Sequence, residues 1–131
     1  MIFDYELMFT DKNIAFTPAT SGVVGRIVDV AGAGQGKGFR SWIGFAFKQA
    51  VTGGPLKFTL ETADNEEFTN SKEIPLSMPA LSASDMYAGA VYSAPLPAVG
   101  MERYCRLKIT ATSAVTLTGL ESGFVLDATQ V

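Results

Sequence analysis

The segment AGAGQGKG, residues 31–38, looks most like a nucleotide-binding loop, with four glycines and one lysine. A Walker-type phosphate loop requires G-x-x-x-x-G-K-[ST]. Gly36 and Lys37 fit this pattern, but Ala31 takes the first glycine position and Gly38 replaces the hydroxyl residue that would bind magnesium. The dinucleotide pattern G-x-G-x-x-G fails at Lys37, and the residues that follow alternate as a strand instead of opening a helix. We therefore interpret 31–38 as a glycine-rich loop between two strands, either free or fixed on a neighbouring subunit.

Residues for other enzyme chemistry are also scarce. The sequence contains no histidine, which is the commonest general base and metal ligand. The single cysteine, Cys105, shares a strand face with apolar residues, which indicates a buried thiol and not a nucleophile. The acidic stretch 64–67 lacks the glycine and the closing acid of a calcium loop. Carboxylate catalysis would need a pair brought together by the fold, for instance Asp85 with Glu102. We expect no enzyme activity, no cofactor and no metal site.

The length, composition and net charge of the chain indicate one ordinary domain over residues 1–131. Of the 131 residues, 47% are hydrophobic and 18% charged, with a net charge of −3. A mild acidic balance does not favour a nucleic-acid partner, which requires a clustered positive face. No apolar run is long enough to span a bilayer, and Asp4 and Glu6 stand where a signal peptide would carry basic residues. We expect neither nucleic acid nor membrane as a partner.

Alternation with a period of two dominates the chain and predicts strands with one buried face. The clearest such segments are 39–48, 55–62 and 103–112. Further strands are expected at 23–30, 72–78, 89–95, 114–120 and 122–128. Turn signals separate them: TGGP at 52–55 in hairpin fashion, a polar loop at 63–71 and PAVG at 97–100. A helix is hard to place, and the best candidates are the opening and a short turn near 80–87. These features predict an all-β, single-domain antiparallel β-sandwich or jelly roll of about eight strands, with an N-terminal arm.

Two apolar features could serve contacts with a partner. The opening, expected as an apolar arm or short helix over 1–12, concentrates large apolar residues: Ile2, Phe3, Tyr5, Leu7, Met8 and Phe9. It must pack either on its own sandwich or on another chain. Trp42 faces away from the phenylalanines of its strand. It could stack on a sugar or anchor a protein interface, or this second face of the strand could be buried too.

The densest basic group is Arg103, Arg106 and Lys108. The last two lie on the outward face of their strand beside Tyr104. We interpret this group as a solvated face or as a salt-bridged contact to an acidic partner, because a nucleic-acid surface would carry more positive charge and stacked aromatic rings.

Three segments resemble the small jelly-roll type of capsid cement (decoration) protein of tailed bacteriophages. They are the start MIFD followed by MFTDKN, the middle LKFTLETADNEEFTNSKEI, and the late block RYCRLKITATSAVTLTGLESGFVLD. Together they extend over nearly the whole chain. None of them is a catalytic signature.

The resemblance implies a non-enzymatic structural subunit of the virion, made in the bacterial cytoplasm and placed on the exterior of the head. It would clamp neighbouring copies of the major capsid protein as a homo-oligomer, dimer or trimer. From their composition, we expect the partner contacts among the apolar N-terminal residues, the glycine loop and the tryptophan: Ile2, Phe3, Tyr5, Leu7, Met8, Phe9, Gly34, Gly36, Lys37 and Trp42. The alternative is a β-sandwich carbohydrate-binding module that uses Trp42 or the tyrosines Tyr87, Tyr92 and Tyr104.

Overall fold

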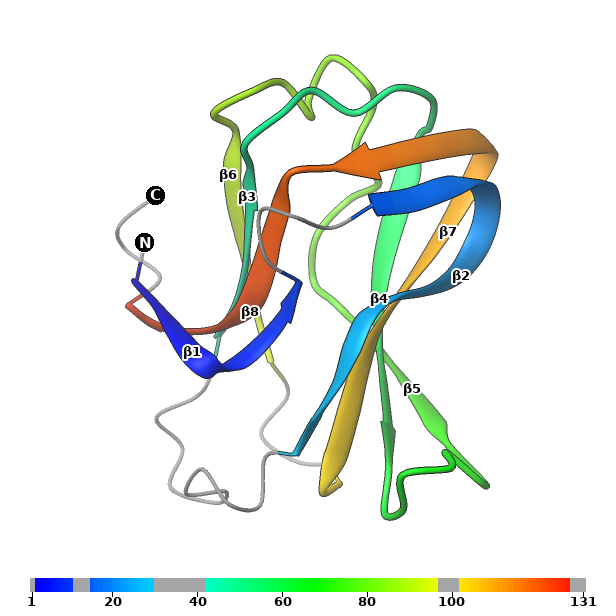
Figure 1. Ribbon diagram of the computed structural model, residues 1–131, viewed down its shortest axis with the longest axis vertical. Helices are drawn as coiled ribbons and strands as arrows, with labels where there is room; N and C mark the ends of the chain where they lie inside the picture. The colour runs from blue at the N-terminus through cyan, green and yellow to red at the C-terminus, as the bar shows by residue number, and fades with distance from the viewer. Residues whose placement is uncertain (1, 11–14, 30–41, 97–101, 128–131) are drawn as a thin grey trace.

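In the computed structural model, two four-stranded antiparallel sheets pack face to face (Figure 1). The structure describes residues 2–10, 15–29, 42–96 and 102–127; for 2–7, 15–19 and 126–127 it describes the backbone alone. The strands are β1 (Ile2–Thr10), β2 (Ala15–Asp29), β3 (Trp42–Phe47), β4 (Leu56–Ala63), β5 (Lys72–Pro75), β6 (Val91–Pro95), β7 (Tyr104–Thr118) and β8 (Leu120–Asp127). Sheet A has the order β1-β8-β3-β6, and sheet B has the order β2-β7-β4-β5. The expected all-β sandwich of about eight strands is therefore confirmed.

The strand order is that of a jelly roll. The hairpin β4–β5 lies innermost in the sequence, and β3–β6, β2–β7 and β1–β8 pair around it in turn. This nested hairpin is rolled up by two further ladders, β3 with β8 and β4 with β7. Every connection except β4–β5 therefore crosses between the sheets, as in a double Greek-key sandwich.

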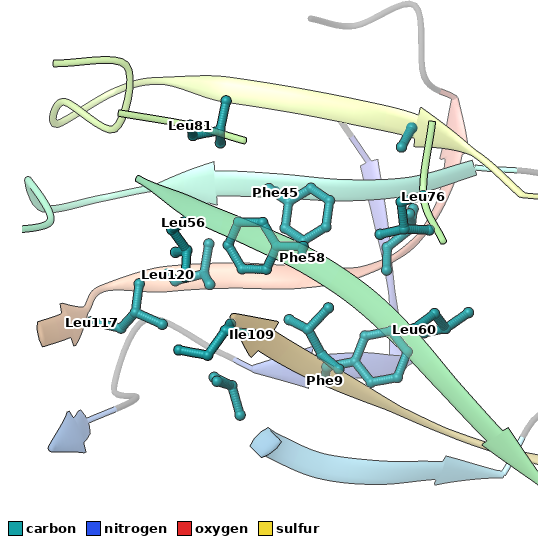
Figure 2. Close-up of a cluster of buried hydrophobic side chains, with 14 of the residues drawn as sticks. Phe9, Phe45, Leu56, Phe58, Leu60, Leu76, Leu81, Ile109, Leu117 and Leu120 are labelled. Atoms are coloured by element: carbon teal, nitrogen blue, oxygen red, sulfur yellow. The ribbon is translucent and has the colours of Figure 1, made fainter. Parts of the chain in front are cut away.

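The core forms because alternate side chains of both sheets point inward. Ile43, Phe45 and Phe47 of β3 are at most 1% exposed. Figure 2 shows Phe45 beside Phe58 of β4, and their rings stack across the sheets at 4.4 Å between centroids. Phe9 of β1 lies in the same cluster and is fully buried. The alternation read from the sequence thus identifies the inward positions correctly.

The side of the sandwich between β5 and β6 is closed by the connecting segment 76–90. Leu76, Leu81 and Met86 of this segment are buried in the core. Leu81 exchanges two backbone hydrogen bonds of 2.8 Å with Leu56 of β4, which fixes the segment against sheet B. The expected turn near 80–87 is present: the Asp85 carboxylate accepts hydrogen bonds from the Ser82 amide and hydroxyl, at 3.0 and 2.9 Å.

The opposite side is closed where β1 meets β2. Gly25 of β2 has φ +82°, and a Cβ built there would lie 2.1 Å from the Phe9 carbonyl oxygen. The buried Thr10 hydroxyl donates a 2.6 Å hydrogen bond to the Leu120 carbonyl, which ties the end of β1 to β8. The two edge strands therefore approach each other backbone to backbone, which only a glycine permits.

Three expectations need correction. The opening is a strand of sheet A, because Met8 and Phe9 are buried while β1 pairs with β8; it is neither a short helix nor a free arm. The segments 103–112 and 114–120 form the single strand β7 up to Thr118, with β8 beginning at Leu120. TGGP at 52–55 joins strands of different sheets and is not a hairpin turn, because β3 pairs with β6 and β8. The loop 31–38 and the turn 97–100 lie outside the described residues.

Candidate docking surface

The outer face of sheet B carries two ion pairs between β7 and its neighbours. Arg106 and Lys108 alternate along β7 with buried Cys105, Leu107 and Ile109, so both basic side chains point outward. Glu61 stands directly opposite Arg106 in the β4–β7 ladder, and the two form an ion pair. Lys108 contacts Glu73 of β5 at 2.7 Å, across the intervening strand β4.

An aromatic ring from the β4–β5 hairpin covers the Arg106–Glu61 pair. The guanidinium carbon of Arg106 lies 4.1 Å from the centroid of the Phe68 ring, and Phe68 is only 6% exposed. The hairpin loop returns toward the sheet because Phe68 and Asn70 adopt positive φ angles of 56° and 57°. Asn65 fixes this loop: its side-chain oxygen accepts from the Thr69 amide at 3.0 Å. Sequence reasoning treated 63–71 as a solvated loop and missed this contact, although a lone phenylalanine among polar residues is a signal for it.

The remaining described basic residue of the group, Arg103, is also engaged within the chain. Its guanidinium donates two hydrogen bonds to Asp29 of β2, at 3.1 and 2.9 Å, and lies 5.0 Å from the centroid of Tyr104. The hydrogen bond to Asp29 raises the pKa of Arg103, and the hydrogen bond to Glu73 raises the pKa of Lys108. The three basic residues of this group therefore pair with acidic residues of the chain itself, and the contact to an acidic partner stays a prediction.

The candidate reactive groups are each occupied by structural contacts. Cys105 is fully buried, and burial raises the pKa of its thiol to about 11. A thiol with such a pKa is almost entirely protonated at neutral pH and is a poor nucleophile. Asp85 holds the turn at Ser82, whereas Glu102 forms an ion pair with Lys72 at 3.1 Å. The two carboxylates thus hold different partners in different segments.

Sheet A carries the exposed tryptophan. Trp42 opens β3, stands opposite Pro95 of β6 and Val125 of β8, and is 38% exposed. Farther along the same face of β3, Gly44 and Ala46 are buried. The second face of this strand is therefore buried in its middle, and part of the Trp42 side chain is accessible to a partner.

The other large exposed apolar side chains lie elsewhere. Val23 and Ile27 are 40% and 37% exposed on β2 of sheet B, and Tyr87 is 58% exposed in the segment 76–90. Sequence reasoning did not single out the first two, although the alternation in 23–30 places an apolar residue on each face. Singly exposed apolar groups are normal on a protein surface, so only their surroundings can assign them a role.

The predicted contact residues are placed unevenly. Met8 and Phe9 are buried at 8% and 1% exposure, so they support the sandwich and present little surface to a partner. The backbone of Ile2, Phe3, Tyr5 and Leu7 belongs to β1, but their side chains lie outside the described part of the chain. Gly34, Gly36 and Lys37 also lie outside it. Trp42 is the predicted contact that the structure places at the surface.

Two of the aromatic residues expected for a carbohydrate-binding module lie in different sheets. Trp42 belongs to sheet A and Tyr104 to sheet B. The Tyr92 hydroxyl donates a 2.6 Å hydrogen bond to the Asp85 carbonyl, and its ring packs edge-on against Phe47. Trp42 and Tyr104 therefore do not form one sugar-binding surface of parallel rings, because they lie in different sheets.

No family model and no curated protein matches this chain. Within the described residues, no three or more acidic or cysteine side chains are grouped as metal ligands. The same part of the chain contains no helix long and apolar enough to cross a membrane.

Proposed function

We propose that this chain is a structural subunit of a tailed-bacteriophage head, a cement protein that binds the outer surface of the capsid and clamps neighbouring major capsid proteins. In this proposal it has no enzymatic role, acts as a homo-oligomer and resides on the virion exterior. The observation that carries the proposal is the jelly-roll topology, into which the three segments that resemble cement proteins fold as paired strands.

Each resembling segment corresponds to a defined part of the sandwich. The described part of the first segment, Ile2–Thr10, forms β1 at the edge of sheet A. LKFTLETADNEEFTNSKEI forms the β4–β5 hairpin with its Phe68-anchored loop. The late block forms β7 and β8, the strands that hold both sheets together from their inner positions. Jelly rolls serve both as capsid domains and as lectins, so the fold supports the proposal without deciding it.

The distribution of surface groups also supports a docking role. Two basic residues on the outer face of sheet B, Arg106 and Lys108, already form ion pairs with Glu61 and Glu73 of the same sheet. Trp42 offers an aromatic group of the kind that dominates protein interfaces when a partner buries it. A subunit that binds only the assembled lattice stabilises that lattice by mass action, and many copies multiply a modest contact into high avidity.

The test uses expanded heads of the phage that encodes this chain, assembled without it. Purified protein is mixed with these heads, and co-sedimentation measures binding, while light scattering of the free protein distinguishes monomer, dimer and trimer. We expect saturable binding of the wild type. Because truncation of a buried interface tryptophan costs more than about 1.4 kcal/mol, Trp42→Ala should weaken binding at least about tenfold.

Tyr87→Ala is the matched control, because Tyr87 is a more exposed aromatic side chain on a different segment. Its binding should equal that of the wild type. Equal loss in both variants would remove Trp42 from the contact. Failure of the folded wild type to bind the heads would end the proposal, and a positive glycan-array signal that Trp42→Ala abolishes would support the carbohydrate-binding alternative instead.

A further inference from the structure

We draw no further inference here: the strongest candidate, the exposed apolar pair Val23 and Ile27 on the edge strand β2 of sheet B, carries nothing because nothing in the structure shows what covers it.

Discussion

Two hydroxyl groups in the interior differ in whether they have a partner. Thr62 and Ser122 are both 0% exposed. The Thr62 hydroxyl donates to the Tyr104 carbonyl at 2.9 Å and accepts from the Glu102 amide at 2.8 Å. Among the described residues, the Ser122 hydroxyl has no hydrogen-bond partner. A buried polar group that is left unpaired costs free energy, whereas a paired one does not.

Ser122→Ala should therefore raise the free energy of unfolding, by about 1 kcal/mol, because it removes an unpaired hydroxyl from the core. Thr62→Val should lower it by about 1–3 kcal/mol, because it leaves the Glu102 amide and the Tyr104 carbonyl without their partner. Urea denaturation measures both changes in the free energy of unfolding, as shifts of the unfolding midpoint at a constant m-value. Destabilisation by Ser122→Ala would show that its hydroxyl has a partner in solution.

Arg106 and Lys108 lie on the same face of β7 but in different surroundings. The Arg106 side chain is 27% exposed and its partner Glu61 only 10%, whereas Glu73, the partner of Lys108, is 54% exposed. Removing one member of a mostly buried pair leaves the other charge desolvated, while exposed pairs contribute little.

We expect Arg106→Ala to lower the free energy of unfolding by about 2 kcal/mol, below the range for fully buried pairs because the arginine keeps some water contact. Arg106→Lys should recover only part of this loss, because an ammonium lacks the planar, delocalised guanidinium that Arg106 places over the Phe68 ring. Lys108→Ala serves as the control and should have a much smaller effect. Chemical denaturation in parallel compares them, and an equal loss in both alanine variants would contradict a special role for Phe68 and Glu61.

At the scale of the elements, the contact between β1 and β2 depends on Gly25. Gly25 and Gly89 both have positive φ angles, of 82° and 96°. A Cβ at Gly89 would meet nothing within 4 Å, whereas one at Gly25 would meet the Phe9 carbonyl. Alanine substitutions at these two glycines therefore separate the cost of backbone strain from the cost of a steric clash.

Gly89→Ala should cost about 1–2 kcal/mol through the left-handed backbone alone. Gly25→Ala should lower the free energy of unfolding by about 1–3 kcal/mol more than Gly89→Ala does, because the two edge strands must also move apart. Thermal unfolding followed by circular dichroism gives the comparison. If both variants lost the same stability, β1 would be free to move away from β2, and the closed edge of the sandwich would not hold in solution.

The strand positions were predictable where the alternation was regular. In β3, β4 and β7 the inward residues could be read directly, because one face of each strand meets the core. The opening could not, since MIFDYELMF is apolar without a strict period, and the β1–β8 ladder contains three register shifts that break the alternation. The contacts of Arg106 with Glu61 and Phe68 were also out of reach, because they depend on the register of strands far apart in the sequence.

At the scale of the whole molecule, the nested hairpin pairs the first strand of the described chain with the last, so each stabilises the other. Ile2 stands opposite Asp127 in the outermost ladder, and Phe9 packs against Phe124 at 5.4 Å between ring centroids. Deletion of residues 1–9 would therefore remove core contacts and expose the edge of β8. Such a truncation tests folding as much as docking, so Trp42→Ala is the cleaner variant for the proposed function.

The pH dependence of stability follows from which groups titrate. The sequence has no histidine, the side chain that ordinarily titrates between about pH 5 and 8. Hydrogen bonds from Ser82 lower the pKa of Asp85 below its ordinary 3.8, so its contribution is present at neutral pH and lost as the pH falls below that value. Burial raises the pKa of Cys105 from 9.0 to about 11, so its contribution is present below pH 9 and lost as the pH rises toward 11. The pKa values of Arg103 and Lys108 are also raised, so the contributions of these two groups to stability are likewise lost at high pH.

We therefore expect the melting temperature to stay level between about pH 5 and 8, to fall in acid as carboxylates are protonated, and to fall again above about pH 9. Differential scanning calorimetry across this range measures it. Cys105→Ala is the informative control, because it should flatten part of the alkaline decline while leaving the acid limb unchanged. A clear step in melting temperature between pH 6 and 7 would contradict the expectation, because it would require a carboxylate or thiol whose pKa the fold moves into that interval.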